Sequence, residues 1–137
     1  MAIKFDAGNR GNLQYADSIG SYTDGKTEGA IPVLWTKALA AGAIGNTDTV
    51  LEYGLVICDA FVVLTGAGVA SCTLTVGTTT AACTSAMAVS GSDKAVVRST
   101  TLDDAQRTIA AGGTIRITTA AGATQPNCIV YVLGYRP

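Results

Sequence analysis

The 137-residue sequence contains no histidine, and charged side chains make up only 14% of it. Histidine is the commonest general base at neutral pH, so its absence excludes the usual nucleophilic triads and removes a frequent metal ligand. Ordinary domains carry about 25% charged residues, and a free monomer normally depends on surface charge for solubility. The low content of charged residues therefore indicates that much of the surface is covered when the protein functions, either by copies of the same chain or by a larger assembly.

The sequence also lacks a basic cluster and a long apolar run. Its nine lysines and arginines are scattered and the formal net charge is −1, whereas nucleic-acid binding requires a concentrated positive surface. Glu52, Gly54 and Asp59 interrupt the most apolar segment, which is too short to predict a transmembrane helix. The first 17 residues have no apolar signal core. We therefore expect no nucleic acid and no membrane as partners, and a protein made and kept in the cytoplasm or released by lysis.

Four cysteines are present, and none belongs to a C-x-x-C pair. Without that spacing or a histidine, zinc is not expected, and we predict no metal or other cofactor. Free cysteine commonly behaves as a small buried apolar side chain, which is the preferred interpretation. The four residues are Cys58, Cys72, Cys83 and Cys128.

Two of these cysteines also support a hypothesis about a disulfide. A hairpin that turns at Gly77-Thr78 places Cys72 directly opposite Cys83. Opposed residues on antiparallel strands have Cβ atoms about 4.5–5.5 Å apart, and a disulfide needs about 3.5–4.5 Å. The pair would stay reduced in the cytoplasm and could close in protein exposed to air after lysis.

Alternation of apolar and polar residues dominates the chain from Ile31 onward. Segment 70–77 alternates apolar side chains with serine and threonine, a period of two that is typical of a half-buried strand. Similar runs separated by Gly, Thr, Ser or Asp turns predict about eight strands and an all-β antiparallel sandwich or barrel over residues 31–137. The expected strands cover 31–37, 49–58, 60–66, 70–77, 81–89, 94–100, 113–119 and 127–136.

Three aromatic residues and the last strand indicate where the core lies. Trp35, Phe61 and Tyr131 occur in apolar strand contexts, so we expect all three in the core. Segment 127–136 is almost continuously apolar, which is typical of a central strand covered on both faces.

Two segments allow other interpretations. Thr101–Gly113 could form a short helix, with Thr101 as the N-cap, acidic residues in the first turn and Gly112 beyond the end. Gly66–Ser71 begins like a phosphate-binding loop, but a period-two strand follows it instead of a helix, and we interpret it as a glycine hairpin. Ser90, Ser92 and Lys94 lie in a separate segment that has the composition of a turn, and we expect no catalytic residues.

Residues 1–30 differ in composition from the rest of the chain. They are rich in Gly, Asn, Asp and Ser and show neither helical nor strand periodicity. We interpret this segment as an extended N-terminal arm that orders only against a partner. A leader without a role is the alternative.

The later part of the chain resembles a known group of proteins. Residues 55–77, 88–96 and 108–137 include a G-T-I-R-I segment at Gly113–Ile117 and a final V-Y-V-L-G-Y-R-P strand at Val130–Pro137. In this they are similar to the small jelly-roll proteins of tailed-phage virions, which include head decoration (cement) proteins and head-fibre or tail-fibre domains. The resemblance implies a β-sandwich of jelly-roll type without enzymatic activity.

The resemblance also implies a function and partners. The chain is expected to be a capsid decoration protein, made in the host cytoplasm and located on the capsid exterior of the virion, where it stabilises the shell. Its partners would be the major capsid protein and copies of itself, as a homotrimer. The arm residues expected to contact the capsid are Phe5, Arg10, Tyr15 and Tyr22.

A second function from another class remains open at this point. The domain could bind a receptor or a glycan as part of a tail fibre or a lectin-like module. Glycan sites require exposed aromatic residues beside polar partners, and Tyr53 with Asp59, or Tyr135, are the candidates.

Overall fold

The computed structural model describes residues 22–23, 26–27 and 31–137. Val33–Tyr135 form one compact unit, and the chain before it belongs with Arg136–Pro137 to a second. Within the second unit, β1 (Tyr22–Thr23) pairs antiparallel with β2 (Lys26–Thr27). These two short strands lie within the segment predicted to be an extended arm. Of the predicted contact residues, Tyr22 lies in β1, and Phe5, Arg10 and Tyr15 lie outside the described residues.

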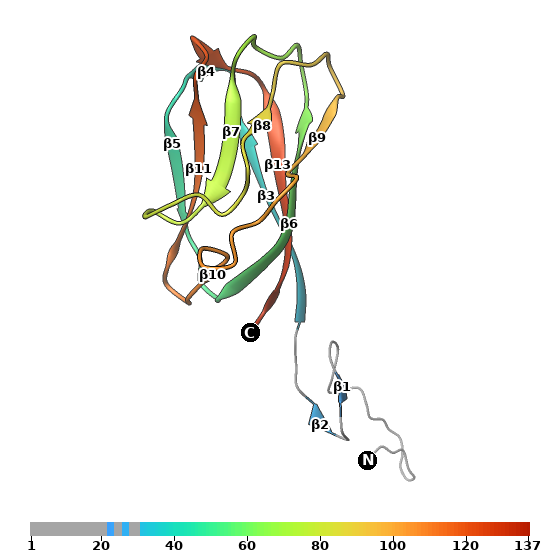
Figure 1. Ribbon diagram of the computed structural model, residues 1–137, viewed down its shortest axis with the longest axis vertical. Helices are drawn as coiled ribbons and strands as arrows, with labels where there is room; N and C mark the ends of the chain where they lie inside the picture. Colours follow the sequence, from blue (N-terminus) through green and yellow to red (C-terminus); the bar gives the residue numbers. More distant parts are fainter. Residues whose placement is uncertain (1–21, 24–25, 28–30) are drawn as a thin grey trace. The chain divides into compact units, whose positions relative to one another are not determined.

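The larger unit is a sandwich of two sheets that face each other (Figure 1). The five-stranded sheet has the order β10-β6-β13-β3, with β9 also paired to β6. Its strands are β3 (Ile31–Leu39), β6 (Leu55–Leu64), β9 (Val96–Arg98), β10 (Thr108–Ile109) and β13 (Cys128–Arg136). The four-stranded sheet has the order β5-β11-β7-β8, with β5 (Asn46–Val50), β7 (Thr73–Gly77), β8 (Met87–Ala88) and β11 (Thr114–Ala120).

A further short pair, β4 (Gly42–Ala43) with β12 (Thr124–Gln125), is antiparallel. The predicted all-β class and the sandwich of antiparallel sheets are thus confirmed, and the described residues contain no helix.

The core lies between the two sheets because every long strand alternates inward and outward. Val62 and Val130 point inward from the five-stranded sheet, Leu74 and Ile117 from the other, and all four are essentially fully buried. Burial of one such side chain contributes about 1.5–3 kcal/mol, and the inward set is the main source of stability. Trp35 packs against this core, as predicted.

The segment Gly66–Ser71 joins the two sheets and does not form the predicted hairpin. It follows β6 in one sheet and leads to β7 in the other. A Cβ atom on Gly68 would lie 2.6 Å from the carbonyl oxygen of Val89, and the Gly68 N–H donates to the carbonyl of Gly91 at 2.8 Å. Only glycine fits where the crossing chain approaches this backbone so closely.

Strand β6 runs through Asp59, where the sequence predicted a break between two strands. Its register with β13 shifts at one point, because Leu133 pairs with Asp59 while Gly134 pairs with Ile57. Cys58 is therefore the extra residue of a β-bulge, which lets the strand continue past an irregular position.

The short helix that was one possible interpretation of Thr101–Gly113 does not form. Asp103 N–H donates to the carbonyl of Cys83 at 2.7 Å, and residues 108–109 form β10. Ile109 is buried in the core. Gly112 has a φ of +79°, but it belongs to the turn between β10 and β11 and not to a helix end. Pairing with neighbouring segments has overridden the local capping signals.

Gly134 provides a test of the bulged register. A Cβ atom there would lie 2.1 Å from the carbonyl oxygen of Val56, a distance that requires the backbone to move. We expect Gly134→Ala to lower the free energy of unfolding by about 2–3 kcal/mol, measured by chemical denaturation. Gly42→Ala is the control, since nothing lies within 4 Å of its added Cβ. Equal stability of the two variants would contradict the register.

Candidate functional site

The candidate functional site is one of two outer faces of the sandwich, which differ in chemistry. Each consists of the side chains that alternate away from the core. We call the outer side of the four-stranded sheet the polar face; it carries Asn46, Asp48, Val50, Thr73, Thr75, Thr114, Arg116 and Thr118. We call the outer side of the five-stranded sheet the apolar face; it carries Leu34, Asp59, Phe61, Val63, Val96, Arg98, Ile129, Tyr131 and Leu133.

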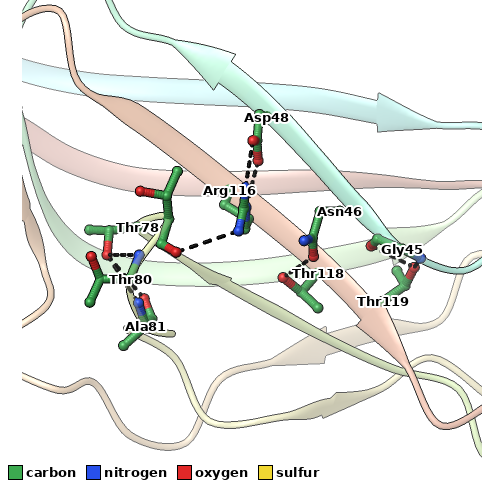
Figure 2. Close-up of polar contacts among 10 residues, drawn as sticks. Gly45, Asn46, Asp48, Thr78, Thr80, Ala81, Arg116, Thr118 and Thr119 are labelled. Carbon is green, nitrogen blue, oxygen red and sulfur yellow. Dashed lines mark hydrogen bonds and ion pairs between the residues drawn. The ribbon is translucent and has the colours of Figure 1, made fainter.

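On the polar face, the charged groups are paired with each other. Arg116 donates from Nε and Nη2 to the two carboxylate oxygens of Asp48, each at 2.7 Å, and Thr118 donates to the side-chain oxygen of Asn46 at 2.9 Å (Figure 2). The hydrogen bonds from Arg116 hold the pKa of the Asp48 carboxyl below its usual value and raise the pKa of Arg116. This bidentate pair is satisfied within the sheet, so it offers no uncompensated charge to a ligand.

A buried hydroxyl at one end of this sheet has a structural role. Thr119 points inward and is almost fully buried. It accepts the N–H of Gly45 at 3.0 Å and donates to the side-chain oxygen of Gln125 at 2.7 Å (Figure 2 shows Gly45 and Thr119). Gln125 in turn donates to the carbonyl of Ala40 at 2.9 Å. These bonds fasten β5, β11 and the β4–β12 pair together.

On the apolar face, two aromatic rings stack in register. Phe61 pairs with Tyr131 across β6 and β13, and their ring centroids lie 4.9 Å apart with planes only 7° from parallel. The guanidinium carbon of Arg98 lies 5.3 Å from the centre of the Phe61 ring, and Arg98 Nε lies 3.3 Å from a carboxylate oxygen of Asp59. The two charged groups of this face thus pair with each other.

Apolar side chains extend from this aromatic pair to both sides of the sheet. Val63 lies between Ile129 on β13 and Val96 on β9. Val96 is 62% exposed on β9, and Leu34 is 59% exposed on β3. Val33 and Trp35, the neighbours of Leu34 along the strand, both pack against the core. Because side chains alternate along a strand, Leu34 points away from the core. The apolar surface therefore crosses the whole width of the sheet.

The predicted core positions of Phe61 and Tyr131 are wrong. Both rings are half-buried and lie on the outward side of strands whose inward residues, Val62 and Val130, fill the core. The near-continuous apolar run of β13 was the sequence feature that could have revealed this face. It predicted that both sides of the strand are covered by other parts of the protein or by a partner. Within residues 33–135, the structure supplies that cover on one side only.

The candidate glycan residues lie at separate places. Tyr53 is exposed in the turn before β6. Asp59 lies within β6, where its carboxylate pairs with Arg98. Tyr135 is half-buried near the end of β13, opposite Val56.

The other residues considered for catalysis or metal binding do not form a site either. In the serine–lysine segment, the Lys94 ammonium lies 3.0 Å from a carboxylate oxygen of Asp93. The described part of the chain has no group of three or more Cys, Asp or Glu residues arranged to hold a metal ion. Nor does it contain a helix able to span a membrane.

The register that underlay the predicted Cys72–Cys83 bridge is wrong. Leu74 pairs with Met87, and the carbonyl of Cys72 accepts the N–H of Val89 at 2.9 Å. Cys83 instead donates its N–H to the carbonyl of Val76 at 2.8 Å. The turn after β7 is wider than a two-residue hairpin, and the chain leaves the ladder before it forms β8, so Cys72 and Cys83 are not opposed.

All four thiols are free, and all but Cys58 are buried. Burial raises the pKa of Cys72 and Cys83. Burial, with a smaller contribution from Cys72, raises the pKa of the Cys128 thiol to about 11. The predicted role of cysteine as a buried apolar side chain thus applies to three of the four.

Comparison of the chain with models of protein families, with curated proteins and with solved structures finds no match.

The cysteine environments predict a pattern of alkylation. In the folded protein at pH 8, iodoacetamide should modify the exposed Cys58 and leave the three buried thiols, Cys72, Cys83 and Cys128, unmodified. Burial raises the pKa of all three, and at a pKa of about 11 only about one part in a thousand of Cys128 is thiolate. Peptide mass spectrometry before and after denaturation measures this. Rapid native labelling of Cys128, at the rate found in the unfolded chain, would contradict the described packing.

Proposed function

We propose that this protein is a non-enzymatic structural component of a virion, a decoration protein that docks on the outer surface of the capsid and stabilises the shell. The observation that carries the proposal is the apolar face. A β-sandwich that leaves Leu34 and Val96 about 60% exposed beside stacked aromatics has a surface suited to contact with another protein.

The order of the strands supports the resemblance to jelly-roll proteins. If the eight strands β3, β5, β6, β7, β8, β9, β11 and β13 are numbered one to eight in chain order, one sheet reads 1-8-3-6 and the other 2-7-4-5. Successive strands thus repeatedly change sheets, as in the two interleaved Greek keys of a jelly roll. This architecture hides most strand edges while it leaves two broad outer faces.

The distribution of charge supports a structural role more than a catalytic one. On the polar face Arg116 forms an ion pair with Asp48, and on the apolar face Arg98 forms an ion pair with Asp59. A catalytic site normally needs titratable groups with shifted pKa values that converge on a pocket. The paired charges and the absence of histidine from the sequence favour binding by shape and apolar contact.

In this proposal copies of the sandwich associate with one another on the capsid, and the N-terminal segment reaches the major capsid protein. Many identical copies on one shell can turn modest individual contacts into firm attachment, because multivalency multiplies their effect. The arm residues Phe5, Arg10, Tyr15 and Tyr22 remain the proposed contacts.

Location on the virion tests this function. Cryo-electron microscopy of the particles that carry the chain should show it at regularly repeated sites on the outer shell. Deletion of residues 1–25 should abolish binding to purified capsids while the sandwich keeps its thermal unfolding transition, because Val33–Tyr135 form a compact unit of their own. Unchanged capsid binding would contradict the role of the segment. A position at the tail tip would overturn the decoration function in favour of receptor or glycan binding.

A further inference from the structure

The apolar face has a property that narrows the kind of partner it can accept. Its two charged groups, Arg98 and Asp59, already form an ion pair, and Arg98 also lies over the Phe61 ring. The face is therefore neutral as a whole. A strongly charged partner would find no uncompensated charge to pair with, and would bury its own charges at a cost.

We propose that the apolar face is the surface through which copies of this chain associate with one another. The proposal deepens the proposed structural function and rests on it. A second copy supplies a neutral, apolar and charge-poor surface, so contact between two such faces desolvates no unpaired charge. Each copy also brings both members of an ion pair, so two copies in contact have no net like-charge repulsion.

Face-to-face contact between two β-sheets is a common kind of packing in proteins. Two sheets in this same molecule already pack through their apolar sides, which is the usual packing of β-sandwiches at a spacing of about 10 Å. The stacked Phe61–Tyr131 pair lies centrally, with Leu34 on β3 and Val96 on β9 at the two sides. A central aromatic pair with an apolar surround is the arrangement that concentrates binding energy in protein interfaces.

The size of the face predicts the strength of association. Four strands about 4.8 Å apart, each with about three outward residues spaced by about 6.8 Å, span roughly 400 Å². This is typical of the largest functional patches on monomers but only about half of what one partner buries in a standard interface. We therefore expect weak association, of the kind that a repeated lattice of sites strengthens.

The N-terminal segment of the same chain fits the face less well. Seven of the first 30 residues are charged, against 12 of the remaining 107. A segment with that density of charge would place several ions over neutral, apolar residues, whereas a second copy places none beyond those already paired.

Sedimentation of the pure full-length protein tests the inference. The variants are Leu34→Lys and Val96→Lys, at two edge strands of the apolar face. Val50→Lys is the matched control, because Val50 is 68% exposed on an edge strand of the polar face. Lysine is readily accommodated on exposed edge strands, and thermal unfolding of each variant verifies that it is folded.

We expect the wild type and Val50→Lys to form the same oligomer over 1–200 µM, and each apolar-face variant to raise the dissociation constant at least tenfold. A wild type that stays monomeric to 200 µM overturns the inference, as does equal association of Leu34→Lys, Val96→Lys and Val50→Lys. Deletion of residues 1–25 should leave association unchanged. If the deletion abolished association, the contact between copies would belong to that segment and not to the apolar face. Because the assay uses no capsid, its failure is distinguishable from failure of the decoration function, which capsid binding reports.

Discussion

Packing of the two sheets against each other determines which side chains of this molecule are buried and which remain outside. Side chains alternate between the two sides of each strand. When one residue points into the core, the residues before and after it therefore point to an outer face. Val62 and Val130 fill the core, and for that reason Phe61 and Tyr131 lie outside it. The core needs only the inward set to be apolar. The outward set is free to vary, and the two sheets of this molecule use that freedom in opposite ways.

The difference between the two outer faces connects the fold to its proposed function. On the polar face, Asp48 and Arg116 satisfy each other, and threonines provide a hydrated β-surface that needs little charge. On the apolar face, one ion pair lies among aromatic and aliphatic side chains. A chain with 14% charged residues cannot protect such a face by charge. Contact with another protein would remove this apolar area from water, which is the physical argument for the proposed assembly.

Much of the sandwich could be predicted from the sequence, because alternation is a local record of burial. It located β7, β11 and β13 well. It could not assign Phe61 and Tyr131, since both sides of their strands are apolar and the pattern gives no direction. It also failed where distant pairing decided the outcome. Thr101–Gly113 carries helix-capping signals, yet the bond from Asp103 to Cys83 holds it against another segment. The register of Cys72 depended on the width of a turn that composition does not encode.

In the proposed assembly, copies of the same chain cover the apolar face. Hydroxyl-radical footprinting of the full-length protein at low and high concentration measures this directly, because it reports the solvent exposure of individual side chains. We expect oxidation of Leu34, Phe61 and Tyr131 to fall severalfold as the concentration rises from about 1 to 200 µM, while oxidation of the exposed Val50 on the polar face stays constant. Equal oxidation of the apolar face at both concentrations, or protection of Val50 instead, would contradict it.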